Sequence, residues 1–363
     1  MIGTAVKTIG KSYLYMRGAI SRPRLLKATI NVTNYCNVRC KTCAIWNIYE
    51  KDPTRAADEM SLTDYYKLFD ELQGISYIEF SGGEPFMRQD VVDMVSGAAS
   101  RIKSLSTCSL TTNGLLTNVI LDGVLSLLNS LPSGIRLVVG VSLDGTPDIH
   151  YSQRRVETSF ERALETFLGL RELSIKYPQL EPHISYTIST YNAGELPKFR
   201  DYLKQQNIDF NDVTITYQHA GFLYRTAKAS IKNVKDVLDD VNYAIKNRRI
   251  KFGGGLFGLI KSHFYSYYLK KLRGYIANPD KMVLPCAALT LSAYVDPYGD
   301  VYPCVIWDEN IGNLRENSFT EIYQSPVAEQ VRKKIAEEKC PNCWTPCEAQ
   351  PSYLMAFPKV LAN

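Results

Sequence analysis

Strand-like and helix-like stretches alternate along the chain from residue 26 to about residue 218. The strand-like runs are apolar and rich in β-branched residues, and they cover 26–33, 75–80, 105–111, 135–143, 183–190 and 213–218. The helix-like stretches between them cover 61–72, 90–102, 116–128, 159–174 and 195–206. This alternation predicts βα units around a parallel sheet, with the chemistry at the carboxyl ends of the strands.

Three cysteines follow the first predicted strand in a short loop. Cys36, Cys40 and Cys43 stand in the run TNYCNVRCKTCAIW with the spacing C-x3-C-x2-C. Three thiolates can bind three irons of a cubic [4Fe–4S] cluster and leave one iron open to a substrate or cofactor. A zinc site would need a further Cys or His nearby, and the next along the chain are Cys108 and His150. The triplet therefore favours an iron–sulfur site, whereas Cys108 is typical of an inert buried thiol.

A glycine pair follows the second predicted strand. The run SGGEP places Gly82 and Gly83 directly before Glu84. Two glycines let the backbone bend sharply and approach a ligand closely, and a carboxylate suits a ligand's ammonium group. Taken alone, this run is also typical of a plain turn.

The cysteine triplet and the GGEP run together resemble the radical S-adenosylmethionine (SAM) superfamily. The resemblance implies an α/β fold, a partial (β/α)6 TIM-like barrel. It also implies that the triplet binds a [4Fe–4S] cluster and that the methionine part of SAM binds its open iron beside Gly82, Gly83 and Glu84. The residue before the third cysteine is often aromatic in the family and is Thr42 here, but Trp46 lies close by and can supply apolar cover.

Later strand ends carry further SAM contacts that the resemblance implies. TTNG closes the third predicted strand and VSLDG the fourth, and both look like family segments that reach SAM. We expect Thr112 and Ser142 to act as hydroxyl donors and Ile188 to face the adenine. Arg154 or Arg155 suits the methionine carboxylate, because a guanidinium binds a carboxylate in bidentate fashion. The Asp-Gly pair within VSLDG is also typical of an ordinary turn.

Five cysteines stand in the last quarter of the chain. Cys286 and Cys304 form a C-x12-G-x4-C pattern whose central turn predicts a hairpin. Cys340, Cys343 and Cys347 follow with the spacing C-x2-C-x3-C. Two separated cysteine pairs are typical of a zinc ribbon. Beside a radical SAM barrel, however, the region resembles the SPASM/Twitch extension.

That second resemblance implies an auxiliary [4Fe–4S] cluster. The full SPASM pattern has more cysteines than the five found here, so we expect the shorter Twitch form with one fully ligated cluster. Four of the five would bind it, and the spacing leaves open which of the last three does not. The expected organisation is an N-terminal basic amphipathic segment, a barrel, a helical connector and a small Cys-rich α+β domain, at 1–22, 23–222, 223–280 and 281–363.

Charge and hydropathy argue against several protein classes. The chain has 42 basic and 37 acidic residues, a balance that does not favour nucleic-acid binding. No window approaches the ~18 apolar residues of a spanning helix, and the N-terminus lacks the apolar core of a signal peptide. Nine cysteines without an export signal fit metal binding in a reducing compartment. We therefore expect a cytoplasmic protein.

Two basic stretches leave peripheral membrane contact open. Residues 1–22 interleave Lys and Arg with apolar side chains, and residues 256–275 are basic and strongly aromatic. A basic amphipathic helix can lie on a membrane surface, and an aromatic face can line a lipid or substrate cleft. Either stretch can equally be packed against the rest of the protein.

The resemblance implies an enzyme in which SAM is cleaved to a 5′-deoxyadenosyl radical that abstracts hydrogen from an unactivated carbon. Ferredoxin or flavodoxin would supply the electron, and the auxiliary cluster would bind the substrate or transfer an electron. We expect a small or lipid-linked substrate such as a sugar, polyol or isoprenoid lipid, as in calditol-type headgroup synthesis. A peptide- or protein-modifying SPASM-type maturase is the alternative, and a non-catalytic iron–sulfur scaffold is a third class.

Overall fold

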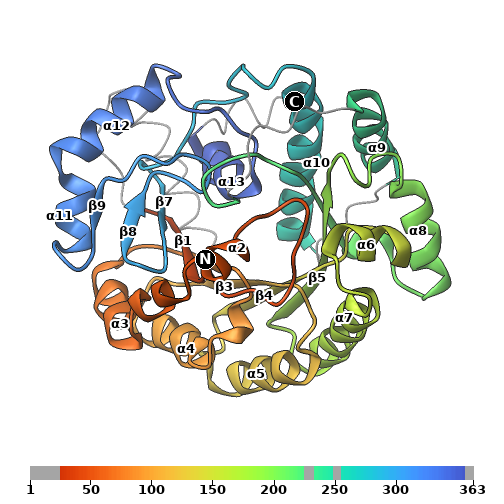
Figure 1. Cartoon of the computed structure of the whole chain (residues 1–363), viewed down its shortest axis with the longest axis horizontal. Coiled ribbons are helices and arrows are strands. Elements are labelled where there is room, and N and C mark those ends of the chain that lie inside the picture. The colour runs from red at the N-terminus through yellow and green to blue at the C-terminus, as the bar shows by residue number, and fades with distance from the viewer. Residues whose placement is uncertain (1–24, 225–232, 248–254, 356–363) are drawn as a thin grey trace.

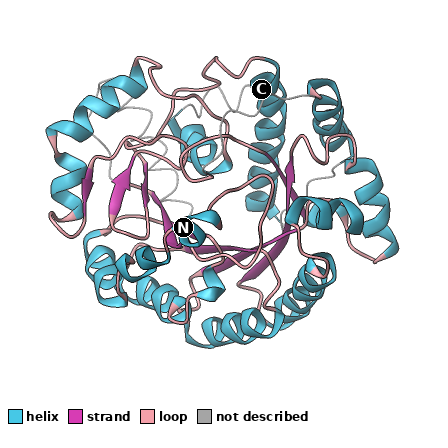
Figure 2. Cartoon of the chain, viewed as in Figure 1, coloured by secondary structure: helices cyan, strands magenta, loops and turns pink. Residues whose placement is uncertain are grey.

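The computed structural model describes residues 25–224, 233–247 and 255–355. The N-terminal segment at 1–22 lies outside these residues. Within the described part, a curved sheet carries a row of helices on its convex side (Figures 1 and 2).

Six parallel strands form the barrel part of the sheet. They are β1 (Lys27–Thr33), β2 (Tyr77–Gly82), β3 (Thr107–Thr112), β4 (Arg136–Ser142), β5 (Leu180–Ile188) and β6 (Val213–Tyr217). Each strand pairs in parallel with the next. The expected partial (β/α)6 barrel is confirmed.

The helices between these strands also follow the sequence pattern. They are α3 (Leu62–Glu71), α4 (Val91–Arg101), α5 (Thr117–Ser130), α7 (Ser159–Lys176) and α8 (Leu196–Gln205). Two short helices, α2 (Asn47–Lys51) and α6 (Pro147–Arg154), were not predicted. They are too brief to show a clear apolar period.

The two faces of the sheet differ sharply in polarity. On β5, Ile184, Tyr186 and Ile188 are fully buried, and the Tyr186 ring stacks on Phe199 of α8 at 5.2 Å. Side chains alternate along a strand, so the residues between them face the interior of the barrel. By this alternation and the strand register, the inner face carries the polar residues Lys27, Thr29, Glu79, Ser109, Thr111, Glu181, His183, Ser185, Thr187, Thr214 and Thr216, together with Tyr77 and Val138. Parallel strands that are covered on both faces usually carry apolar residues on both. Here the inner face is largely polar instead.

The C-terminal region extends the same sheet. Strand β7 (Ser292–Val295) pairs in parallel with β1, and β8 (Asp300–Tyr302) and β9 (Gly312–Asn313) follow in antiparallel fashion. The expected hairpin is confirmed: Gly299, with φ of 88°, lies in the turn between β7 and β8. Pairing with β7 covers the edge of β1, so the expected boundary near residue 281 separates two parts of one nine-stranded sheet.

Helices complete the C-terminal region. These are α9 (Val234–Asn247), α10 (Gly255–Ala277), α11 (Phe319–Gln324), α12 (Pro326–Ala336) and α13 (Pro346–Met355). Figure 1 shows α13 inside the ring formed by the sheet, α10 and α12. Helix α13 therefore closes part of the barrel interior.

The aromatic side chains of α10 pack within the protein. Tyr268 stacks on Trp344 at 5.9 Å, and Tyr267 meets Tyr353 of α13 at 5.7 Å. Both α10 tyrosines are almost fully buried. This part of the aromatic stretch belongs to the core and does not line a lipid cleft. Among the described residues, no helix is long and apolar enough to cross a membrane.

Candidate functional site

The first cysteine triplet lies in the loop between β1 and α2. Cys40 is buried, while Cys36 and Cys43 are half-buried. Burial raises the pKa of Cys36 and of Cys43 to about 12, and each thiol is close enough to Cys40 for its charge to add to this rise. The thiolate forms of these cysteines therefore need a nearby positive charge to stabilise them, as a bound metal provides.

Gly82 and Gly83 hold the end of β2 against this loop. A Cβ on Gly82 would lie 1.9 Å from Asn31 Oδ1, and one on Gly83 would lie 2.0 Å from the carbonyl oxygen of Tyr35. Gly82 also has φ of 131°, which L side chains rarely adopt. The amide of Glu84 then donates to the Tyr35 carbonyl at 2.7 Å. Only glycine permits this close approach to the residue before Cys36.

The carboxylate of Glu84 joins the end of β2 to the end of β3. It is fully buried and accepts hydrogen bonds from the Thr112 hydroxyl at 2.8 Å, the Asn113 amide at 2.7 Å and the Phe86 amide at 3.2 Å. Burial raises its pKa to about 7. The Asn113 side chain also donates to Asn37 Oδ1 in the cysteine loop at 2.7 Å. Glu84 and Thr112 thus lie together beside the cysteines, although both already have protein partners.

An ion pair at the end of β4 faces the cysteine loop. Asp144 is fully buried and accepts from Arg154 Nε at 2.8 Å, while its other oxygen accepts from the Thr187 amide at 3.0 Å. Burial raises the pKa of Cys40, and the positive charge of Arg154 opposes that rise. Arg155, in contrast, is exposed at the end of α6 with φ of 60°. The structure therefore brings Arg154 to the loop and leaves Arg155 on the surface.

Two further predicted SAM contacts lie at the strand ends. Ser142 is paired in register with Ser185 on the inner face of the sheet, where a bound cofactor would lie. Ile188 is fully buried on the same side of β5 as Ile184 and Tyr186, the side covered by helices. This placement brings Ser142, but not Ile188, to the interior.

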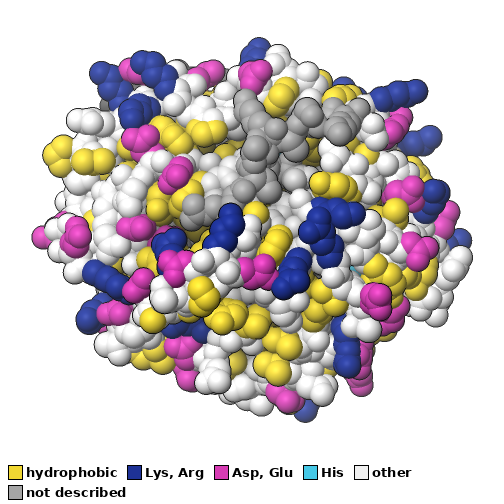
Figure 3. Space-filling view, viewed as in Figure 1, with side chains coloured by type: hydrophobic (Ala, Val, Ile, Leu, Met, Phe, Trp, Pro, Cys, Tyr) yellow, Lys and Arg dark blue, Asp and Glu magenta, His cyan; other side chains and the backbone are white. Residues whose placement is uncertain are grey.

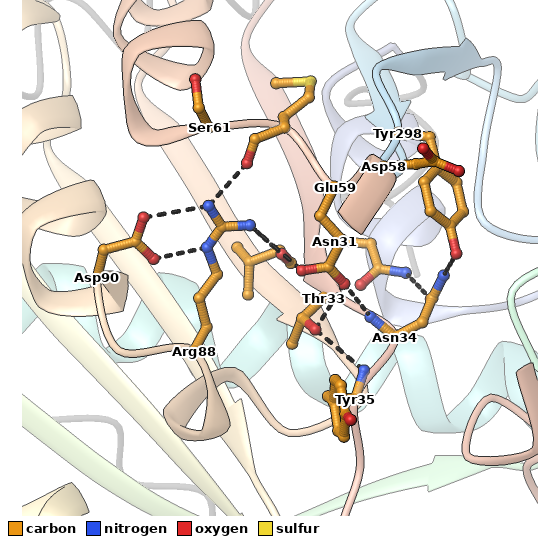
Figure 4. Close-up of polar contacts among 12 residues, drawn as sticks. Asn31, Thr33, Asn34, Tyr35, Asp58, Glu59, Ser61, Arg88, Asp90 and Tyr298 are labelled. Atoms are coloured by element: carbon orange, nitrogen blue, oxygen red, sulfur yellow. Dashed lines mark hydrogen bonds and ion pairs between the residues drawn. The ribbon is translucent and has the colours of Figure 1, made fainter. Parts of the chain in front are cut away.

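A polar network fixes the start of the cysteine loop (Figure 4). Glu59 accepts from the Thr33 hydroxyl at 2.7 Å and the Asn34 amide at 3.0 Å. Arg88 pairs with Asp90 at 2.6 Å and donates to the carbonyls of Val32 and Met60 at 3.0 and 2.7 Å. These contacts hold the end of β1 and the first residues after it in place. The motifs considered in the sequence did not indicate this network, because its members come from four separate segments.

The C-terminal region contributes to the same network. Tyr298, in the turn between β7 and β8, accepts a hydrogen bond from the Asn34 side chain at 3.0 Å. Its hydroxyl lies 3.3 Å from that of Tyr49 in α2. Figure 4 shows Tyr298 and Arg88 on opposite sides of Glu59. The auxiliary region therefore helps to position the first cysteine loop.

Four of the five distal cysteines line one cavity. They are Cys286, Cys304, Cys340 and Cys343, and the remaining wall is largely apolar. The Ala288 amide donates to Cys286 Sγ at 3.4 Å, a contact that stabilises a thiolate. Burial raises the pKa of Cys286 and Cys304 well above the usual range.

Cys347 points away from this cavity. Its thiol lies 3.5 Å from Glu79 Oε2 on the inner face of β2, and Glu79 pairs with Lys27 of β1 at 2.7 Å. The Cys347 carbonyl has no helical partner in α13, because Pro351 lacks the N–H that would bond to it four residues later. Lys27 Nζ donates to that carbonyl at 3.3 Å instead. Spacing alone cannot reveal this arrangement.

Among residues 25–224, 233–247 and 255–355, no three Cys, His, Asp or Glu side chains converge as they would around one metal ion.

Family models match both parts of the chain. The model of the radical SAM superfamily matches residues 30–203, and that of the SPASM iron–sulfur cluster-binding domain matches residues 286–344. The second match contains the four cysteines of the cavity and ends before Cys347.

Curated relatives share low identity over most of the chain. The antilisterial bacteriocin subtilosin biosynthesis protein AlbA of Bacillus subtilis is 23% identical over 331 residues, which cover 90% of this chain and 65% of AlbA. The Fe-coproporphyrin III synthase of Methanosarcina barkeri is 25% identical over 313 residues, covering 81% of this chain and 72% of the synthase. The chain thus spans about two thirds of AlbA.

A solved structure shares the fold. The structure of anSMEcpe with bound AdoMet and the Cp18Cys peptide covers 93% of this chain and 98% of its own, with a TM-score of 0.55 at 16% identity. The protein is an enzyme whose cofactors are a [4Fe–4S] cluster, SAM and auxiliary iron–sulfur clusters. The chain therefore belongs to the radical SAM superfamily and carries a C-terminal SPASM domain.

Proposed function

We propose that this chain modifies a peptide or protein substrate by abstracting a hydrogen atom from it. When bound, the open cluster and SAM supply the reactive organic radical, and ferredoxin or flavodoxin supplies the electron. The residues of the chain hold the cofactors, exclude water and orient the substrate. The proposal has two parts. The first assigns the residues that bind the cofactors, and the second infers the substrate class from the polarity of the barrel interior.

Cys36, Cys40 and Cys43 are the proposed ligands of the open cluster. Gly82 and Gly83 allow the end of β2 to approach this loop, and Glu84 joins it to the end of β3. Arg154 is the proposed partner of the SAM carboxylate, since Asp144 holds its guanidinium beside Cys40. The contacts of Thr112 and Ser142 with SAM remain part of the proposal.

Cys286, Cys304, Cys340 and Cys343 are the proposed ligands of the auxiliary cluster. They line one cavity, and four thiolates complete the coordination of a cubic cluster. Cys347 is left out of this set because its thiol lies against Glu79. This proposed set gives one auxiliary cluster with full protein ligation.

The polar inner face of the barrel is the observation that carries the choice of substrate. His183 and Ser185 of β5 share this face with Thr214 and Thr216 of β6, whereas Lys27 and Glu79 pair with each other beside Cys347 of α13. A site for an isoprenoid chain would be lined by apolar side chains. Peptide groups instead need hydrogen-bonding partners when they leave water. A polar peptide therefore suits this interior better than the lipid-linked substrate expected from the sequence.

The relatives support the same choice. AlbA is named for bacteriocin biosynthesis, and anSMEcpe was solved with a peptide bound. Nothing in the comparisons supports a role in lipid biosynthesis. The aromatic part of α10 that motivated the lipid expectation packs on α13.

A porphyrin substrate is the second candidate. The chain covers 72% of the Fe-coproporphyrin III synthase, a larger share than the 65% of AlbA that it covers. A porphyrin carries carboxylates, and Lys27 and His183 lie on the inner face that would receive them. The pairing of Lys27 with Glu79 reduces the positive charge available for this purpose.

The two candidates differ in which compound stimulates SAM cleavage. Anaerobically reconstituted protein is incubated with SAM, a reductant and either a library of short synthetic peptides or Fe-coproporphyrin III. We expect peptides to raise 5′-deoxyadenosine formation by at least about tenfold, with deuterium transfer from a labelled peptide. The variant with all three loop cysteines replaced by Ala is the control. Stimulation by the porphyrin alone would reverse the choice.

A further inference from the structure

The segment that follows β6, residues 219–224, touches the residue after three different cysteines. We call it the strap. His219 contacts Trp344, which follows Cys343, and Leu223 contacts Val305, which follows Cys304. Tyr224 contacts Ala44, which follows Cys43. One short segment thus bonds to both the first cysteine loop and the auxiliary site.

His219 forms the first of these contacts. Its Nδ1 lies 2.7 Å from the carbonyl of Tyr217 and donates to it, so Nε2 is free to accept from the Trp344 amide at 3.0 Å. The ring is almost fully buried and stacks on Tyr275 of α10 at 5.2 Å. Burial lowers the pKa of His219 to about 4, so the ring stays neutral in this role. The loop between Cys340 and α13 is thereby fixed to the end of β6.

The middle of the strap runs along the residues after Cys304. The amides of Phe222 and Leu223 donate to the carbonyls of Ile306 and Val305 at 3.1 and 3.0 Å. A Cβ on Gly221 would lie 2.9 Å from the Ile306 oxygen and 3.0 Å from its Cα. The glycine is therefore needed for this close backbone approach.

Tyr224 completes the connection. Its carbonyl accepts from the Ala44 amide at 2.8 Å. Burial raises the pKa of its hydroxyl, and the nearby Cys347 and Cys43 add to the rise. The strap thus joins the two iron–sulfur sites through backbone hydrogen bonds as well as packing.

We propose that the strap is a positioning element that couples the two iron–sulfur sites, so that a cluster in one site orders the loop of the other. A cluster in the cavity fixes the residues after Cys304 and Cys343, and these fix the strap. The strap then holds Ala44 and the first cysteine loop in their bound geometry. Once one cluster has ordered the strap, the second cluster binds without the entropic cost of ordering it again. This coupling acts equally in both directions. The inference rests on the ligand assignment above and is independent of the choice of substrate.

Hydrogen exchange of the reconstituted protein tests the coupling without reference to activity. The double variant Cys340→Ala/Cys343→Ala removes two proposed ligands of the auxiliary cluster while leaving the first loop unchanged. Peptides covering residues 36–46 should exchange at least about threefold faster in this variant, whereas those covering α5 should not change. Unchanged exchange in residues 36–46, with the iron content halved, would overturn the coupling. Full iron content in the variant would instead overturn the ligand assignment.

Two changes in the strap itself complete the test. Gly221→Ala should loosen residues 36–46 and residues 300–306 together, even with both clusters loaded. Gly274→Ala in α10 is the matched control, because a Cβ there meets nothing within 4 Å. If Gly221→Ala does not fold, His219→Phe removes the acceptor for Trp344 and the donor to the Tyr217 carbonyl but keeps an aromatic ring beside Tyr275. For either strap variant, exchange in residues 36–46 equal to that of the control would contradict the proposal.

Discussion

The two cysteine groups of this protein differ in how completely the chain surrounds them. The first group offers three thiols in a loop at the strand ends, with Arg154 beside Cys40. The second offers four thiols that line one cavity with largely apolar walls. An open coordination position is typical of a catalytic metal site, and full protein ligation is typical of a structural or electron-transferring one. We therefore propose that the same type of ligand serves two purposes, which differ because the surrounding chain differs.

The largest expected effect comes from the open group. Replacing Cys36, Cys40 and Cys43 by Ala should lower 5′-deoxyadenosine formation by about 1,000-fold or more, since the open iron is lost. Iron per chain should fall by about half, because the auxiliary cluster remains. Both quantities are measured on anaerobically reconstituted protein. SAM cleavage at the wild-type rate would refute the assignment of this loop.

The five distal cysteines should differ in how much iron is lost when each is replaced. Cys340→Ala should remove about half of the iron, whereas Cys347→Ala should leave the iron content unchanged, because its thiol contacts Glu79 and not the cavity. Iron and sulfide analysis of the two variants side by side checks this. Equal losses from both would show that the cavity does not define the ligand set.

Removing one partner of the ion pair at the open site should be strongly destabilising. Arg154→Ala leaves the fully buried Asp144 without its partner, which costs about 3–5 kcal/mol of unfolding free energy. Arg155→Ala, at the next and exposed position, should change it by no more than about 0.5 kcal/mol. Urea denaturation of the apoproteins measures both. Similar values for the two variants would remove the structural basis for placing Arg154 beside the cluster.

A smaller effect is expected at Thr112. Thr112→Val removes the hydrogen bond to the buried Glu84 and the acceptor of the Gly114 amide, and it should cost about 1–3 kcal/mol of unfolding free energy. Thr112→Ser should recover most of the loss, since it keeps the hydroxyl. Denaturation of the apoproteins, with SAM titration of the reconstituted ones, separates the internal bond from a direct contact with SAM. A loss of SAM affinity without any loss of stability would favour the direct contact.

The sequence predicted most of the barrel because each strand and helix carries its own period. The strands and most helices lie within a few residues of their expected bounds, whereas the eight residues of α6 are too few to show a period. The motifs also located Gly82, Gly83 and Glu84 beside the cysteines. What they did not indicate depends on contacts between distant segments. The roles of Asp144 and His219 and the direction of the Cys347 side chain are examples.

The contrast between an open and a closed site is tested most directly by electron paramagnetic resonance of the reduced, fully reconstituted protein, before and after SAM is added. The account predicts two cluster signals, of which SAM shifts only one. The shifted signal must be the one that disappears when Cys36, Cys40 and Cys43 are replaced by Ala. A shift of the signal that persists in that variant, or no shift at all, would contradict the assignment of the open site.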